Sequence, residues 1–272
     1  MKINLGYEIS ISCPQPTEVI TLLEINKDRQ GDIISQDAVQ LAPDVDSHVY
    51  LDVFGNLCRR LTAPAGGVTL SYNALVNDDG KPDEIDETAR ETPIHDLPDD
   101  VILYLLGSRY CETDELMELA WRLFGPVAPS WPRVKAIFNY VHDRLTFGYG
   151  HARATRTAAQ AHEEQVGVCR DFAHLAIAFC RCMNIPARYV NGYLGDIGVP
   201  ADPAPMDFSA WTEVYLDGKW YTLDARHNRP RIGRVVIARG RDATDVPLLH
   251  TFGPHQLTTF RVWTDELDAG PS

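Results

Sequence analysis

The sequence predicts an α+β protein, and three patterns along the chain indicate this fold class. Residues 1–76 consist mainly of strand-length segments separated by turn signals. Residues 99–183 carry several stretches with apolar side chains at helical spacing, and residues 187–263 return to segments typical of strands. A strand-rich part, a helical part and a second set of antiparallel strands together are typical of α+β proteins.

The composition narrows the class of protein further. The 272 residues are enough to bury a large core, and 44% hydrophobic and 23% charged residues are ordinary for a globular protein. A formal net charge of -13 argues against nucleic acid or membrane as the main partner, because both require clustered Lys and Arg. The start, "MKINLGYEISIS", lacks the apolar core of a signal peptide, and no stretch approaches the roughly 18 apolar residues of a membrane span. We therefore expect a soluble cytoplasmic protein.

The first part of the chain predicts a β-rich domain followed by a linker. The expected strands are "INLGYEISI", "EVITLLEI", "HVYLDVF" and "GGVTLSYNALV". Residues 78–100 then hold ten acidic side chains against Lys81 and Arg90, which indicates a solvated acidic linker. We expect a β-rich N-terminal domain with this linker over residues 1–98, and a second domain, which includes the C-terminal strands, over residues 99–272.

The helical part predicts helices in "DDVILYLLGSRY" (99–110), "ETDELMELAWRLFG" (112–125) and "SWPRVKAIFNYVHDRL" (130–145). Ser130 can cap the last of these, and Pro132 suits its first turn. A further helix is expected over residues 169–183. The strands expected after it are 187–194, about 208–216, 219–225, "IGRVVIA" and "QLTTFRVW".

Cys169 opens the helix in "VGVCRDFAHLAI". Exposed backbone N–H groups and the helix dipole lower the pKa of a thiol at this position, and the thiolate is the nucleophile. Asp171 favours the helix end electrostatically, and Gly167 permits a close approach by backbone or ligand. The alternative is a buried cysteine that acts as a small hydrophobic side chain. The position of Cys169 at the helix start alone does not distinguish a nucleophile from a buried structural cysteine.

The remaining cysteines and histidines predict no metal site and no cofactor. The six cysteines include no CxxC pair, and Cys180 and Cys182 point in different directions on a helix. "HEEQV" lacks the second histidine of a zinc protease motif, and the acidic segment contains no Asp-x-Asp-x-Asp-Gly calcium loop.

The segment "DFSAWTEVYLDGKWYTLDARHN" (207–228) predicts a β-hairpin. Asp217-Gly218 suits a two-residue type I′ turn, which places Leu216 opposite Lys219. Ser209, Trp211 and Glu213 then share one sheet face with Asp224. In this register Ser209 and Asp224 are diagonal neighbours, with backbones about 7–8 Å apart. A base at position 209 could thus be oriented by the carboxylate of Asp224.

These segments carry a family resemblance. "GVCRDFAHLAIAFCRCMNIPARYVNGYL" (167–194), followed by "SAWTEVYLDGKWYTLDA" (209–225), closely resembles the transglutaminase-like superfamily of papain-like cysteine enzymes. Residues 1–76 resemble the N-terminal domain of its bacterial members. The resemblance implies a papain-like core and a Cys-His-Asp triad, with the nucleophile on Cys169 and the orienting acid on Asp224. It puts the histidine at position 209, where this chain has a serine.

Ser209 cannot serve as a base near neutral pH, because its hydroxyl offers only hydrogen bonds. Other histidines could substitute. His174 lies about 140° round the helix from Cys169, which favours packing. The strand parity of His227 predicts that it faces away from Asp224 unless the chain bends before Pro230. His151 lies in a loop, and His250 and His255 lie in a late loop that could fold over the cleft.

Three further residues are candidates for the cleft. Trp211 could form a wall or belong to the core, and Arg170 could help to hold a thiolate. Glu213 shares the Ser209 face, although a solvated or salt-bridged glutamate is the simpler interpretation. Arg188 is expected in a structural ion pair.

Two functions therefore remain open. The first is a transglutaminase-like thiol enzyme that acts on amide bonds of a peptide or protein through Cys169, as a peptidase, an amidase or an acyl transferase. The second is a catalytically impaired family member that works as a peptide- or protein-binding module, because Ser209 replaces the histidine.

Overall fold

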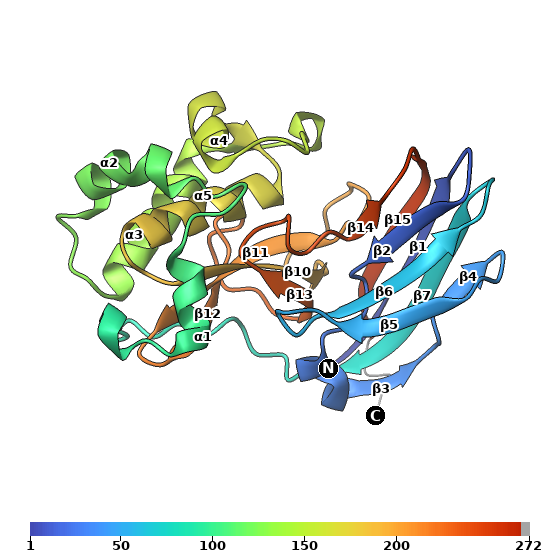
Figure 1. Cartoon of the computed structure of the whole chain (residues 1–272). Coiled ribbons are helices and arrows are strands. Elements are labelled where there is room, and N and C mark those ends of the chain that lie inside the picture. Colours follow the sequence, from blue (N-terminus) through green and yellow to red (C-terminus); the bar gives the residue numbers. More distant parts are fainter. Residues whose placement is uncertain (268–272) are drawn as a thin grey trace.

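A β-sandwich and a helix-covered sheet form the two lobes of the computed structural model, which describes residues 1–267 (Figure 1). One sandwich sheet has the strand order β15-β1-β7-β3, with β4 also paired to β7, and the other has the order β14-β2-β6-β5. The strands are β1 (Lys2–Ser12), β2 (Thr17–Thr21), β3 (Ile33–Gln36), β4 (Gln40–Ala42), β5 (Ser47–Leu51), β6 (Leu57–Ala63), β7 (Val68–Asn77), β14 (Leu249–Thr251) and β15 (Gln256–Leu267). The β-rich first part predicted from the sequence is thus present.

The last two strands lie in the sandwich and not in the helical lobe, in contrast to the expected grouping of residues 99–272. β15 runs antiparallel to β1 along its whole length, from Lys2↔Leu267 to Ser12↔Gln256. β14 pairs with β2 in the other sheet. Alternating apolar and polar residues predict a strand but do not say which strand it pairs with, so the sequence pattern could not assign these segments.

The acidic segment between β7 and the first helix is held in place, so the expectation of a solvated linker is wrong for much of it. Asp83 is paired with Arg234, and Glu91 is paired with Arg133, at 3.0 Å in both cases. Ala89 is fully buried. The basic partners lie far away in the sequence, so charge counting along the segment could not reveal them. The segment crosses from the sandwich to the helical lobe (Figure 1).

The second lobe contains the α-helices and a four-stranded antiparallel sheet of order β12-β11-β10-β13. The helices are α1 (Asp99–Ile102), α2 (Thr113–Phe124), α3 (Trp131–Arg144), α4 (Ala158–Glu164) and α5 (Cys169–Cys182), and the 3-10 turns are η1 (Lys27–Asp32), which lies in the sandwich, η2 (Ile94–Asp96), η3 (Leu103–Leu105) and η4 (Tyr149–His151). The strands are β10 (Ala187–Leu194), β11 (Ser209–Leu216), β12 (Lys219–Leu223) and β13 (Arg234–Gly240), together with the short parallel pair β8 (Thr146–Phe147) and β9 (Val166–Gly167).

Two helices differ from the expectation. The helix expected over 99–110 stops early, because Leu106 has an extended backbone (ψ 146°). Its carbonyl oxygen accepts a hydrogen bond from the Arg181 guanidinium instead of continuing a helix. Helix α4 was not predicted. It begins with a capping box in which Thr157 and Gln160 satisfy each other's backbone N–H groups.

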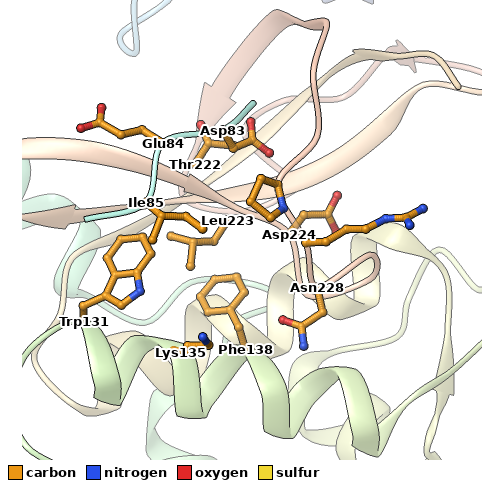
Figure 2. Close-up of a pocket in the computed structure, with 12 residues that line it drawn as sticks. Asp83, Glu84, Ile85, Trp131, Lys135, Phe138, Thr222, Leu223, Asp224 and Asn228 are labelled. Carbon is orange, nitrogen blue, oxygen red and sulfur yellow. The ribbon is translucent and has the colours of Figure 1, made fainter. Parts of the chain in front are cut away.

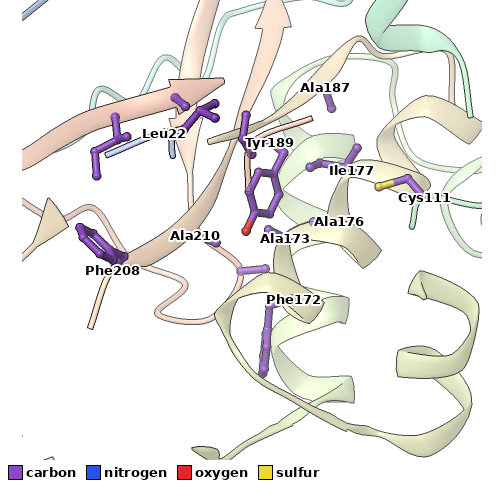
Figure 3. Packing of buried hydrophobic residues seen from close by; sticks show 14 of the residues in the cluster. Leu22, Cys111, Phe172, Ala173, Ala176, Ile177, Ala187, Tyr189, Phe208 and Ala210 are labelled. Atoms are coloured by element: carbon purple, nitrogen blue, oxygen red, sulfur yellow. The ribbon is translucent and has the colours of Figure 1, made fainter. Parts of the chain in front are cut away.

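Helix α5 is the centre of this lobe. Every residue from Asp171 to Cys182 is buried, because α2, α3 and α4 pack around α5 on one side and β10 and β11 on the other. Figure 3 shows Ala173 and Ala176 on α5 close to Tyr189 of β10 and Ala210 of β11. These small side chains let the helix lie close to the sheet. This packing determines the distance between Cys169 and β11. Within residues 1–267, no helix is long and apolar enough to cross a membrane.

The attachment of β15 to the sandwich can be tested at Gly6. A Cβ atom at this residue would lie 2.2 Å from the Tyr72 carbonyl oxygen and 2.3 Å from the ring of Trp263 on β15. We predict that Gly6→Ala lowers the free energy of unfolding by about 2–3 kcal/mol, because overpacking forces the strands apart. Chemical denaturation measures this value. Gly31→Ala is the control, since nothing lies within 4 Å of its added Cβ; equal stability of the two variants would contradict the packing of Trp263 on Gly6.

Candidate active site

Cys169 is the first residue of α5, and a buried ion pair shapes the helix start. The Asp171 carboxylate accepts a hydrogen bond from the Val168 N–H at 2.9 Å and pairs with Arg156 at 3.0 Å. A Cβ on Gly167 would lie 2.6 Å from the Cβ of Asp171, so glycine is needed for this close approach. The expected electrostatic role of Asp171 at the helix end agrees with this arrangement.

Cys169 is a half-buried residue, and it lines a cavity together with Ser209 and Ala210 of β11. Burial raises the pKa of Cys169 to about 11, although the Arg226 guanidinium and the Ala210 N–H act in the opposite direction. This rise in pKa is opposite to the direction expected from the position of Cys169 at the helix start. A neutral thiol of this kind becomes a nucleophile only if a base removes its proton during the reaction.

The hairpin that faces the cysteine has the predicted register. Thr212 pairs with Leu223 and Leu216 pairs with Lys219. Asp217 and Gly218 have φ values of +44° and +83°, as a type I′ turn requires. The ladder ends at Leu223, so the residues after it are free to leave the strand direction.

Asp224 is the buried acid of this region. Its Oδ2 accepts hydrogen bonds from His227 Nδ1 at 2.8 Å and from Arg234 Nη2 at 3.1 Å. Its Oδ1 accepts the backbone N–H groups of Arg226 and His227. Burial alone would raise the pKa of Asp224, but the His227 hydrogen bond and the Arg234 charge together hold it well below its ordinary value. Asp224 is therefore a carboxylate that orients an imidazole.

The alternation of side chains along a strand predicted that His227 faces away from Asp224, and this prediction is wrong. The chain bends directly after Asp224, where the Asn228 N–H donates to the Asp224 carbonyl oxygen at 2.8 Å. This bend carries the His227 ring back onto the carboxylate. An aspartate that ends a strand and binds the N–H groups two and three residues later forms an Asx turn. The spacing Asp-x-x-His in "DARHN" was the only sequence signal for this contact.

Ser209 lies between the cysteine and this histidine. It is buried, and its Oγ has no hydrogen-bond partner among residues 1–267. It lines a cavity of about 410 Å³ that also contains Cys169, and a smaller cavity of about 90 Å³ that contains Arg226 and His227. The structure therefore brings Cys169, Ser209, Asp224 and His227 to one region.

Of the three cleft candidates, one lines the Cys169 cavity and two do not. Arg170 lines it, and its guanidinium donates to the carbonyl oxygens of Ala154 and Arg153. Trp211 is buried with the Arg234 guanidinium 4.8 Å from its ring. Glu213 forms ion pairs with Arg188 at 2.5 Å and Arg239 at 3.0 Å. Trp211 and Glu213 border a different cavity.

The other histidines have various environments. His174 is buried between Tyr110 and Tyr189, and its Nε2 accepts the Ala243 N–H, which agrees with the expected packing role. Burial lowers the pKa of His174, so it stays neutral. His255 lines the Cys169 cavity from the sandwich side. Among the residues that the structure describes, no group of three or more His, Cys, Asp or Glu side chains could hold a metal ion.

The back of Asp224 is closed by α3 and the acidic segment. A cavity of about 90 Å³ lies there, lined by Trp131 and Phe138 of α3 and by Asp83 and Ile85 of the acidic segment. Figure 2 shows these side chains on opposite sides of Leu223 and Asp224. Because the Asp224 side chain is only 2% exposed, its hydrogen bonds form in surroundings with little water, where they are strong.

Comparisons with known proteins agree with this architecture. Residues 118–225 match the family described as the transglutaminase-like superfamily. A crystal structure named "a Putative Cysteine Protease from Cytophaga hutchinsonii" is 30% identical, covers 100% of this chain and 92% of that one, and superposes with a TM-score of 0.85. The chain belongs to the transglutaminase-like superfamily, a family of thiol enzymes. Cys169, Ser209 and Asp224 fall within the matched residues, and His227 lies just beyond them.

Two curated relatives are uncharacterized mycobacterial proteins. One from Mycobacterium tuberculosis is 30% identical over 146 residues, which are 50% of this chain and 46% of that protein. One from Mycobacterium leprae is 30% identical over 116 residues, which are 42% of this chain and 41% of that protein. The chain thus spans about half the length of the curated relatives it matches, or slightly less.

The ionised state of Asp224 predicts a pH-dependent stability. Asp224→Asn should lower the free energy of unfolding by about 3 kcal/mol near neutral pH, because it leaves Arg234 with one buried partner fewer. Since the folded pKa is depressed, the contribution of Asp224 is fully present above its unfolded pKa of about 3.9 and is lost as the pH falls below that value. Denaturation curves of both proteins between pH 3 and pH 7 measure the difference.

Asp143→Asn on α3 is the matched control, because Asp143 is exposed. It should change stability by less than about 0.5 kcal/mol. A gap between wild type and Asp224→Asn that widens as the pH falls would argue against an ionised, buried Asp224.

Proposed function

We propose that this protein is a thiol hydrolase that cleaves amide bonds of peptides or proteins, with Cys169 as nucleophile and His227 as base. The observation that carries the proposal is the 2.8 Å hydrogen bond from His227 Nδ1 to the buried Asp224 carboxylate. In the family pattern the histidine stands at position 209. Here a different histidine uses the same acid, and it reaches that acid from the turn after β12 rather than from β11.

The chemistry follows from the protonation states. With Nδ1–H donating to Asp224, the lone pair of His227 lies on Nε2, which is the atom that accepts a proton. His227 removes the proton of Cys169 as the sulfur attacks the amide carbonyl carbon. The negative charge that develops on the carbonyl oxygen is stabilised by the backbone N–H of Cys169 at the start of α5.

The second half of the reaction uses the same proton. The imidazolium of His227 donates it to the leaving amine nitrogen, the C–N bond breaks, and a thioester on Cys169 remains. Water then attacks the thioester while His227 accepts a proton from it, and the acid product and free thiol are released. Asp224 stays ionised throughout and stabilises the imidazolium. An amine in place of water would give acyl transfer; hydrolysis is the proposed outcome.

The residue at position 209 is consistent with this route. Ser209 borders both the Cys169 cavity and the His227 cavity. A serine fills less of the space between them than an imidazole ring, which leaves an approach from His227 toward the sulfur. Arg226, next to His227 in the chain, is close enough to Cys169 to lower its pKa electrostatically. This electrostatic influence supports a position of the turn that carries His227 near the thiol.

A second candidate function is a peptide- or protein-binding module without turnover. The raised pKa of Cys169 and the serine at position 209 both favour it. In that case the fold and cleft would be retained for binding, and the thiol would stay protonated near neutral pH.

Substitutions at the two competing base positions distinguish these functions. We predict that His227→Ala lowers kcat/KM for N-acyl peptide p-nitroanilides by about 10²- to 10⁴-fold, the usual contribution of a general base. Ser209→Ala should leave the rate within a few-fold of wild type, because its hydroxyl moves no proton. Release of p-nitroaniline measures both rates.

The controls are the other accessible histidines. His151→Ala, on an exposed turn, should keep wild-type activity. Loss of activity in His255→Ala but not in His227→Ala would move the base to the sandwich side of the cavity. If the wild-type protein shows no turnover and Ser209→His creates it, the binding module is the better interpretation.

A further inference from the structure

The cavity beside Cys169 is formed jointly by the two lobes. The sandwich contributes Ile9 of β1 and Leu257 and Phe260 of β15 to its lining. The helical lobe contributes Cys169 and Tyr189. The volume of the cavity, about 410 Å³, lies within the usual range of about 300–1,000 Å³ for small-molecule sites. The sandwich therefore forms one wall of the candidate active site.

The wall contributed by the sandwich is accessible and mainly apolar, with His255 as a polar member. Leu257 is 51% exposed and Phe260 is 38% exposed, although both are large hydrophobic residues. Phe208, which directly precedes Ser209, packs edge-on against Phe260 with ring centroids 6.0 Å apart. Val246 and Leu248 extend the apolar surface on the segment that leads to β14. Exposed apolar side chains gathered at a cavity beside a nucleophile are typical of a binding surface.

The cavity on the other side of Ser209 differs in character. Asp196, Asp202, Arg226 and His227 line it, so charged groups dominate its wall, and Asp207 borders both cavities. A histidine that protonates the leaving nitrogen must lie on the side of the amide where the amine departs. In the proposed reaction, the leaving amine therefore lies toward the charged cavity, and the acyl part lies on the opposite side of the sulfur.

We propose that the apolar cavity is the subsite for the acyl side of the scissile amide, and that it selects an apolar side chain on the residue that acylates Cys169. This inference rests on the proposed function for the direction of the substrate. Two features of the cavity indicate this occupant. The cavity contains the sulfur that bears the acyl group, and aliphatic and aromatic side chains form most of its wall, beside the polar Arg170, Asp207 and His255.

Two probes of similar size test the selection. N-acetyl-leucine p-nitroanilide and N-acetyl-asparagine p-nitroanilide differ mainly in the polarity of the side chain next to the scissile bond. Wild-type protein should cleave the leucine probe with a higher kcat/KM. Phe260→Ser should reduce this preference about tenfold, within the range that apolar contacts give in enzyme specificity. Leu257→Ser is a second variant with the same expectation.

The control is Arg261→Ala on the same strand. Arg261 is exposed and alternates to the opposite face from Phe260, so its loss should not change the preference. Equal rates on the two probes in the wild-type protein, or equal effects of Phe260→Ser and Arg261→Ala, would overturn the subsite.

A binding measurement separates this inference from the proposed function. Titration of Cys169→Ala with the leucine probe should show saturable binding that Phe260→Ser weakens, whether or not the wild-type protein turns the probe over. Binding of this kind without wild-type turnover supports the subsite and contradicts the hydrolase. Turnover without any leucine preference supports the hydrolase and contradicts the subsite.

Discussion

The carboxylate of Asp224 is buried, ionised and shared between His227 and Arg234, and the geometry of the candidate site depends on this sharing. A buried carboxylate is stable only if its charge is balanced and its oxygens accept hydrogen bonds. Arg234 provides the balance and is itself held by Asp83 of the acidic segment. His227 thereby gains a fixed orientation. The four side chains form one chain of contacts from the surface segment to the imidazole.

The sequence was sufficient for the local parts of this arrangement. Asp217-Gly218 predicted the turn, and the turn fixed which residues of the hairpin pair, because two-residue loops leave little freedom of register. The position of Cys169 at a helix start followed from the helical spacing after it. The bend after Asp224 could not be predicted from the alternation of side chains between the two faces of a strand, because that pattern assumes a straight strand. The pairing of Asp83 with Arg234 and of β15 with β1 joins residues more than a hundred positions apart, and no local pattern specifies such contacts.

The raised pKa of Cys169 determines how such a site would work. A thiolate paired with an imidazolium is reactive at rest, whereas a neutral thiol reacts only when a base accepts its proton during attack. The site proposed here is of the second kind, so its reactivity depends on the substrate, the cysteine and His227 meeting in one cleft. The sandwich contributes residues of β1 and β15 to the lining of that cleft. Both lobes therefore line the cavity that contains Cys169, although the family match covers only residues 118–225.

The central claim is that Cys169 and His227 act together on an acyl group. Mass spectrometry of the intact protein and of its proteolytic peptides, after brief mixing with an activated N-acetyl-leucine ester, tests it most directly. The account predicts one acetyl-leucyl group on Cys169 in the wild-type protein, formed at least a hundredfold more slowly in His227→Ala, as expected for loss of a general base. Acylation of Cys169 at the same rate in both proteins, or none at Cys169 in the wild-type protein, would contradict the account.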